Sequence, residues 1–230
     1  MILALFPTSV FAAEITDIAS HWAKDQIQSW IDKDLIKGYP DGTFKPENNI
    51  TRAEFMVLVN GAFGYTETVE IEYPDVADTD WFADTIKKAK AAGYISGYAD
   101  GTMKPNNPIS REEAATIIAK IKNLEEDRSE AGKFIDSANM SWSKGTIGAV
   151  SKAGIMSGYP DGTFKPQNPI KRAEAVVALD GALEKIADEE EPKDDRIVYD
   201  RAGTYGPAYE QEKVEKDVII TAAGVTLRNM

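Results

Sequence analysis

The sequence predicts a mainly α-helical protein built from three tandem helix-loop-helix repeats, followed by a short β-like tail. Three segments, 21–55, 80–114 and 141–175, align without a gap from a tryptophan to an arginine. In each segment, apolar residues at helical spacing flank a loop rich in glycine and proline. A unit that recurs at such a period buries its apolar face only against its neighbours.

The first helix of each repeat is expected to begin at a tryptophan that stands 16 residues before a Gly-Tyr pair. Apolar residues such as Ile27 and Trp30 follow at helical spacing. We favour a core position for the tryptophans, with sugar stacking as the alternative. We expect the glycine of the Gly-Tyr pair to end the helix. The tryptophans are Trp22, Trp81 and Trp142, and the glycines are Gly38, Gly97 and Gly158.

The loop between the two helices is expected to turn at an Asp-Gly pair and to run into Lys-Pro. We expect the large apolar residue before the lysine (Phe44, Met103 or Phe164) to be buried in the core. The tyrosine of the Gly-Tyr pair is as well suited to ligand contact as to packing. We expect the loop lysines to be solvated, with support of an anion site as the alternative. The tyrosines are Tyr39, Tyr98 and Tyr159, and the lysines are Lys45, Lys104 and Lys165.

The second helix of each repeat is expected to start near Thr51, Ser110 or Lys171. Thr51 with Glu54, and Ser110 with Glu113, fit a capping box, in which a hydroxyl and a carboxylate each accept a backbone N–H. Lys171 has no hydroxyl, which should weaken that helix start by roughly 1 kcal/mol.

An arginine follows each of these helix starts, where the helix macrodipole opposes a cation. Helix stability therefore does not explain it. One hypothesis is an anion site, in which free helix N–H groups and the guanidinium bind a carboxylate. The alternative is an ion pair with an aspartate of a neighbouring repeat. The arginines are Arg52, Arg111 and Arg172, and the aspartates are Asp17, Asp75 and Asp136.

Composition disfavours several function classes. A formal net charge of −12 argues against nucleic acid and against unaided docking to an anionic membrane. The chain has no cysteine and a single histidine, His21, and it shows no nucleophile or zinc motif. The Asp-Gly loops fail the EF-hand template. We therefore expect no catalytic residues, no cofactor and no metal site.

The two ends differ from the repeats, for which we predict bounds of 14–72, 73–133 and 134–187. Residues 1–13 resemble a signal-peptide remnant, too short to span a bilayer, with an apolar packing segment as the alternative. Residues 188–196 are acidic, as in a linker. Alternation within 197–230 predicts strands at 218–221 and 225–227, which we interpret as the start of a truncated downstream β domain.

The pattern Trp…Gly-Tyr-x-Asp-Gly-Thr-(Phe/Met)-Lys-Pro…Ile-(Thr/Ser/Lys)-Arg-(Ala/Glu)-Glu resembles the S-layer homology (SLH) domain, in three copies over residues 15–187. The resemblance implies a pseudo-threefold arrangement of the repeats, with binding grooves between adjacent units. The family's Thr-Arg-Ala-Glu binding motif matches residues 51–54, and the other copies depart from it at Glu112 and Lys171.

The resemblance further implies a non-covalent cell-wall anchor that binds a secondary cell-wall polysaccharide. That polymer commonly carries pyruvylated sugars, whose carboxylate suits an arginine. We thus expect a secreted protein at the bacterial cell wall, with S-layer self-association assigned to the region beyond residue 230. Two alternatives stay open: a structural module that packs against partner proteins, and the N-terminal anchor of a surface polysaccharide-active enzyme.

Overall fold

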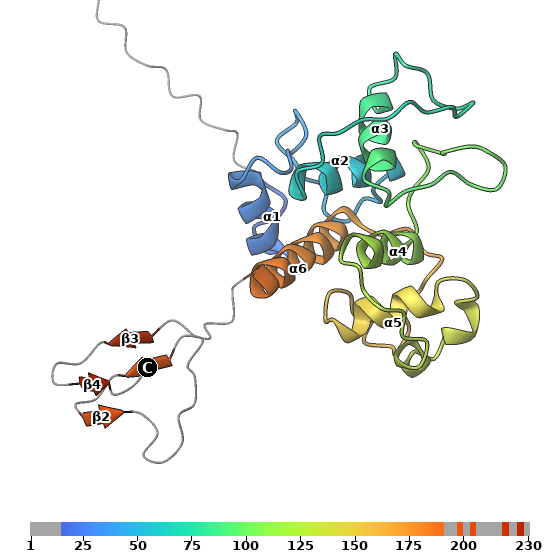
Figure 1. The fold of residues 1–230 in the computed structure, drawn as a ribbon. Helices are drawn as coiled ribbons and strands as arrows, with labels where there is room; N and C mark the ends of the chain where they lie inside the picture. The colour runs from blue at the N-terminus through green and yellow to red at the C-terminus, as the bar shows by residue number, and fades with distance from the viewer. Residues whose placement is uncertain (1–14, 191–196, 200–202, 206–217, 221–224, 228–230) are drawn as a thin grey trace, which may run out of the picture. The chain divides into compact units, whose positions relative to one another are not determined.

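The computed structural model describes residues 15–190 and four short segments, 197–199, 203–205, 218–220 and 225–227. The predicted signal-peptide remnant lies outside these residues. Contacts divide the chain into two units, Met1–Lys185 and Ile186–Met230. Figure 1 shows the helices in chain order. They are α1 (Lys24–Asp32), α2 (Arg52–Ala62), α3 (Ala83–Ala91), α4 (Arg111–Ile121), the 3₁₀ helices η1 (Glu130–Lys133) and η2 (Ser137–Asn139), α5 (Lys144–Lys152) and α6 (Arg172–Glu190).

In the second unit, the described residues form four three-residue strands that pair in parallel, β1 with β3 and β2 with β4. β3 and β4 fall on the two segments for which the sequence predicts strands, while their membership of a longer β domain stays a prediction. Because α6 runs to Glu190, residues 188–190 of the acidic segment are helical, and its remainder, 191–196, lies outside the described residues. The strands are β1 (Ile197–Tyr199), β2 (Gly203–Tyr205), β3 (Val218–Ile220) and β4 (Val225–Leu227).

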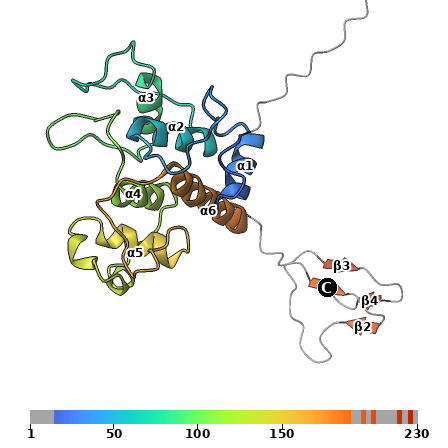
Figure 2. The same cartoon turned by 180° about the vertical axis from the view of Figure 1, so that it is seen from behind.

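The second helix of each repeat packs on the first helix of the next repeat, and the third repeat closes on the first. α2 contacts α3, and α4 contacts α5. In α1, Trp30 Nε1 donates to Asp180 Oδ1 of α6 at 2.7 Å. Figures 1 and 2 show α2, α4 and α6 near the middle of the helical unit, with α1, α3 and α5 around them. The expected pseudo-threefold arrangement is confirmed.

Three isoleucines join the repeats at the centre. The N–H of Ile50 donates to Ile170 O at 3.2 Å, that of Ile109 to Ile50 O at 3.1 Å, and that of Ile170 to Ile109 O at 3.0 Å. All three side chains are fully buried. The closed ring of hydrogen bonds satisfies backbone groups that water does not reach. Each repeat therefore supplies one N–H donor and one carbonyl acceptor to the central backbone of the other two repeats.

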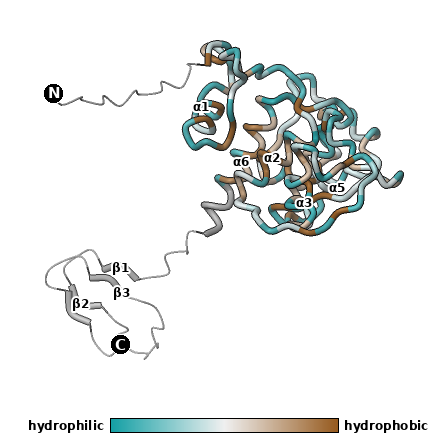
Figure 3. Tube along the Cα trace, turned by 90° about the horizontal axis from the view of Figure 1, so that it is seen from above, coloured by the Kyte–Doolittle hydropathy of each residue, from teal (hydrophilic) through white to brown (hydrophobic). Residues whose placement is uncertain are grey.

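The helix ends differ from the prediction, which was wrong about the glycines. α1, α3 and α5 each end six residues before the predicted glycine, Gly38, Gly97 or Gly158. The left-handed residue after each helix is Asp34, Gly93 or Gly154. The predicted glycines instead allow close packing inside the loop. A Cβ on Gly158, for example, would lie 2.7 Å from Thr163 O. Figure 3 shows hydrophobic and hydrophilic stretches interspersed along the chain of the helical unit.

The starts of the second helices agree with the prediction. Thr51 and Ser110 form complete capping boxes with Glu54 and Glu113. Lys171 keeps half of the box, because its N–H still donates to Glu174 Oε2 at 3.0 Å. The large apolar residue of each loop is fully buried, as predicted. Among the described residues, no helix has the length and apolar character to cross a membrane.

Candidate binding grooves

Three grooves lie at the junctions of the helical unit, and each is lined by residues from all three repeats. We name them by their tryptophans: the Trp22 groove of about 640 Å³, the Trp142 groove of about 600 Å³ and the Trp81 groove of about 400 Å³. Each also contains an arginine from a second repeat and a glutamate from the third. These pairs are, in the same order, Arg111 with Glu174, Arg52 with Glu113, and Arg172 with Glu54.

The tryptophans are exposed, so the preference for a core position was wrong. The exposed fraction is 62% for Trp22, 62% for Trp81 and 55% for Trp142. Each tryptophan stands before the first residue of its helix, so the helical period does not assign it to the apolar face. The residue that follows it is buried instead: Ala23, Phe82 or Ser143. An indole that is half solvated beside a groove is free to stack on a ligand.

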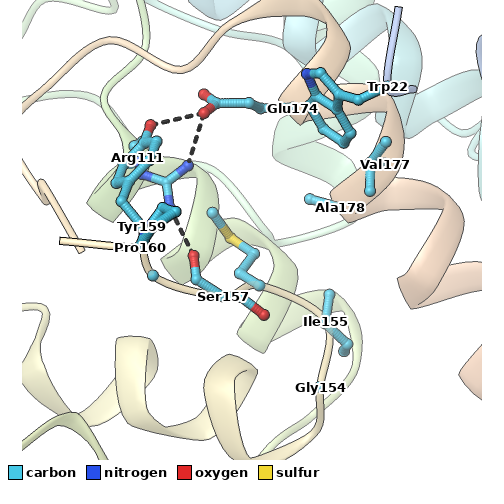
Figure 4. Close-up of a pocket in the computed structure, with 12 residues that line it drawn as sticks. Trp22, Arg111, Gly154, Ile155, Ser157, Tyr159, Pro160, Glu174, Val177 and Ala178 are labelled. Carbon is cyan, nitrogen blue, oxygen red and sulfur yellow. Dashed lines mark hydrogen bonds and ion pairs between the residues drawn. The ribbon is translucent and has the colours of Figure 1, made fainter. Parts of the chain in front are cut away.

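Figure 4 shows the arrangement in the Trp22 groove. Trp22 and Val177 stand on one side, and Arg111, Tyr159 and Glu174 form a linked cluster on the other. Tyr159 donates its hydroxyl to Glu174 Oε1 at 2.6 Å. This pairing of an aromatic, apolar side with a charged, hydrogen-bonded side suits a sugar, which has both C–H faces and hydroxyl edges.

The arginines are buried clasps between repeats, with exposed fractions of 4% for Arg52, 4% for Arg111 and 6% for Arg172. Arg52 Nε donates to Met103 O at 3.0 Å, and its Nη1 donates to Glu113 Oε1 at 3.0 Å. The guanidinium also lies 4.6 Å from the centre of the Tyr98 ring. Each arginine therefore reaches from the start of its own helix into the next repeat around the ring.

Arg111 and Arg172 contact the next repeat in a similar way, but Arg172 makes fewer hydrogen bonds. Arg111 Nε donates to Phe164 O at 2.8 Å, its Nη2 to Ser157 O at 2.9 Å, and its Nη1 lies 3.5 Å from Glu174 Oε1. Arg172 Nε donates to Phe44 O at 3.1 Å, but its Nη1 is 3.8 Å from Glu54 Oε1. Within the described part of the chain, no residue bonds to Arg172 Nη2.

The expected Arg–Asp pairs do not form, because the three aspartates serve the loops of their own repeats. Asp75 Oδ1 accepts from the N–H of Met103 at 2.9 Å, and its Oδ2 accepts from the N–H of Lys104 at 2.7 Å. Asp17 and Asp136 make the same two bonds in the first and third repeats. The ionic partner of each arginine is instead the capping-box glutamate of the next repeat.

The helix N–H groups are also taken, which corrects the expectation of free donors there. The N–H of Arg52 donates to Asn107 O at 2.9 Å, and that of Ala53 donates to Pro105 O at 2.9 Å. Equivalent bonds occupy the first two N–H groups of α4 and α6. A ligand anion therefore does not meet these amides, and it must be bound by side chains that face the grooves.

The tyrosines take part in the clasps. Burial, reinforced by the hydrogen bond to Glu174, raises the pKa of Tyr159 to about 12. The pKa of Tyr98 is raised by burial and by its bond to Glu113. Each loop lysine lies 4.3 Å from the centre of the tyrosine ring of its repeat and 3.0 Å from the aspartate of the Asp-Gly turn. The lysines are thus engaged in cation–π and ionic contacts.

The predicted site residues divide into two groups. Those lining a groove are Trp22, Trp81, Trp142, Arg52, Arg111, Arg172, Tyr98, Tyr159, Gly97, Gly158 and Ser110. Those outside the three linings are Thr51, Lys171, Tyr39, Gly38, Asp17, Asp75 and Asp136. The glutamates of the Arg–Glu pairs were missed as groove residues, although their recurrence two positions after every arginine marks them in the sequence.

Comparison with known proteins decides the family. A family model described as the S-layer homology domain matches residues 14–56, 72–115 and 133–176, together more than half of the chain. The chain belongs to the S-layer homology domain family. SLH domains are anchoring modules that bind cell-wall polymers, and the expected family membership is confirmed.

Curated relatives carry the same module within longer proteins. Cell surface glycoprotein 1 of Acetivibrio thermocellus is 43% identical over 164 residues, which are 65% of this chain and 7% of that protein. The cellulosome-anchoring protein of this species is 37% identical over 160 residues, 66% of this chain and 36% of that protein. Its exoglucanase XynX is 34% identical over 188 residues, 78% of this chain and 17% of that protein. The matched region is thus a minor part of each relative.

Proposed function

We propose that this chain is a non-covalent anchor that binds a secondary cell-wall polysaccharide in its grooves and so holds a secreted protein at the bacterial surface. The observation that carries the proposal is the exposure of Trp22, Trp81 and Trp142, each beside a groove. Exposed tryptophans cost solubility, and their recurrence in every repeat argues for a shared ligand. Pyranose rings present an apolar face that stacks on indole.

A pyruvylated sugar adds a carboxylate, which needs a cation inside a groove. Support for this finer proposal comes from Arg172, whose Nη2 has no hydrogen-bond partner among the described residues and which lines the Trp81 groove. Arg172 is 6% exposed, and a largely buried guanidinium binds a carboxylate more strongly than one in water does. The net charge of −12 does not oppose this binding, because the cations act locally.

Three grooves in one module also favour a polymer over a single sugar. Once one groove is occupied, the next sugar of the same polymer binds at a high effective concentration. Modest affinity in each groove would then hold the protein on the wall. The relatives that share the matched region include both an anchoring protein and an enzyme. We therefore propose that this chain acts as an anchor whichever kind of sequence accompanies it.

A wall-binding assay tests the proposal. Purified sacculi are prepared intact, stripped of their secondary polymer, or treated with mild acid to remove ketal-linked pyruvate. We expect the protein to sediment with intact walls and to stay in solution with stripped walls. Loss of binding after the mild acid treatment supports the pyruvyl carboxylate. Equal sedimentation with intact and stripped walls would refute the polymer as the ligand and favour a module that only packs against proteins.

A further inference from the structure

The Trp142 groove contains a lysine whose ammonium group has no partner among the described residues. Along α4, Glu113, Thr116 and Lys120 line this groove, one helical turn apart. The position of Lys120, nine residues after the arginine, is occupied by glycine in the other repeats. These glycines are Gly61 in α2 and Gly181 in α6.

The Lys120 ammonium group is available for a ligand. Its side chain is exposed, and no residue in the described part of the chain forms an ion pair or hydrogen bond with it. Lys37, in the lining of the Trp81 groove, differs because its Nζ lies 3.4 Å from Asp34 Oδ1. The lining of the Trp22 groove contains no lysine.

The arginine end of the Trp142 groove is unfavourable for an anion. All three guanidinium nitrogens of Arg52 have partners in the next repeat. Two carboxylates lie there, Glu113 and the nearly buried Glu112, whose Oε2 accepts from Ser143 Oγ at 2.6 Å. Since Arg52 balances only one of them, the field at that end is negative. The Cα of Lys120 lies about 12 Å from that of Glu112 along the helix axis.

We propose that Lys120 binds the anionic substituent of the wall polymer in the Trp142 groove, while Trp142 stacks on a neutral sugar face. This proposal rests on the wall-polymer function proposed above. The substituent is a carboxylate or a phosphate, both of which pair with an ammonium group. Lys120 is thus a specificity-determining residue for charged sugars in the Trp142 groove.

A pair of charge-neutralising variants tests the proposal. Lys120→Gln removes the ammonium group at little cost in helix propensity. Lys90→Gln is the matched control, because Lys90 is also an exposed lysine in the last turn of a helix but lies outside the three grooves. The probe is polymer fragments released from purified sacculi, titrated calorimetrically at low and high salt.

We expect Lys120→Gln to weaken binding about three- to fivefold at low salt and to flatten its salt dependence. Lys90→Gln should match the parent. Two treated fragments identify the anion: mild acid removes pyruvate, and hydrofluoric acid removes phosphodiesters. If Lys120 binds one of these groups, removal of that group should abolish the difference in affinity between the parent and Lys120→Gln. Unchanged affinity and salt slope in Lys120→Gln would overturn the inference while the wall-polymer function stands. Absence of all binding by the parent would instead refute the function itself.

A graft provides a gain-of-function test. A Cβ on Gly61 would meet no atom within 4 Å, so Gly61→Lys is sterically free. Gly61 lies one helical turn after Val57, which lines the Trp81 groove, although Gly61 itself is not in that lining. In the Lys120→Gln background, a lysine at this position should reach the edge of the Trp81 groove and restore most of the lost affinity and the salt dependence. Gly61→Gln is its uncharged control and should restore neither. Equal effects of Gly61→Lys and Gly61→Gln would contradict a role for the charge.

Discussion

Arg52→Ala should destabilise the whole helical unit, because Arg52 joins the first repeat to the second. The substitution removes the donors to Met103 O and Glu113 Oε1, both at 3.0 Å, and the stacking on Tyr98. Loss of one partner of a buried ion pair costs about 3–5 kcal/mol. Glu113 keeps donors from Tyr98 and Ser110, and its side chain is 18% exposed. We therefore take the lower end, a loss of about 3 kcal/mol in the free energy of unfolding.

Urea denaturation followed by circular dichroism measures this loss. With an m-value of about 2–3 kcal/mol per molar, the midpoint should fall by about 1–1.5 M. Arg128→Ala is the control, because Arg128 is exposed in a loop and its midpoint should not move. If Arg52→Ala shifts the midpoint no more than Arg128→Ala does, the clasp contributes nothing to stability, and the arginine is there for the ligand alone.

Four further predictions concern stability. Gly148→Ala should cost about 3 kcal/mol in urea denaturation, because its Cβ would lie 1.6 Å from Asp127 O. Gly61→Ala, with open space around its Cβ, should gain about 0.5–1 kcal/mol, and a loss there would contradict the packing of α2. Lys171→Ser should restore the missing cap and raise thermal stability by about 0.5–1 kcal/mol. The pKa of Tyr159 is raised from 10.0 to about 12 in the folded protein, so the unfolded chain loses this proton first as pH rises. The free energy of unfolding should therefore be unaffected by Tyr159 below pH 10 and should fall as pH rises from 10 towards 12. Tyr159→Phe should reduce this slope in melting temperatures measured against pH, and an unchanged slope would argue against the burial.

Local rules predicted much of the fold. The capping boxes at Thr51 and Ser110 involve residues three apart, and the Asp-Gly turns involve adjacent residues, so the sequence contains their full chemistry. The order of helices follows from apolar spacing in the same way. The predicted core position of the tryptophans was wrong because they precede their helices. The helical period of apolar residues, which predicts a buried face, therefore did not apply to them.

The clasp contacts were beyond local rules because their partners lie far apart in the chain. Arg52 and Met103 are 51 residues apart, and Arg172 and Phe44 are 128 apart. The sequence pattern predicted that Gly158 ends a helix, but glycine is needed there because of Phe134. The Cε1 atom of Phe134 would lie 2.5 Å from a Cβ added to Gly158. Only the closed ring brings these residues together. The three unequal grooves likewise arise from pairing different repeats, and a comparison of the repeats one at a time does not show them.

The most direct test of the anchoring account is wall binding by the triple variant Trp22→Ala, Trp81→Ala and Trp142→Ala. The three side chains are exposed, so the variant should keep the parent's melting temperature within a few degrees. The account predicts that the folded variant no longer sediments with intact sacculi, whereas the parent does. A folded triple variant that sediments as well as the parent would contradict binding through the grooves.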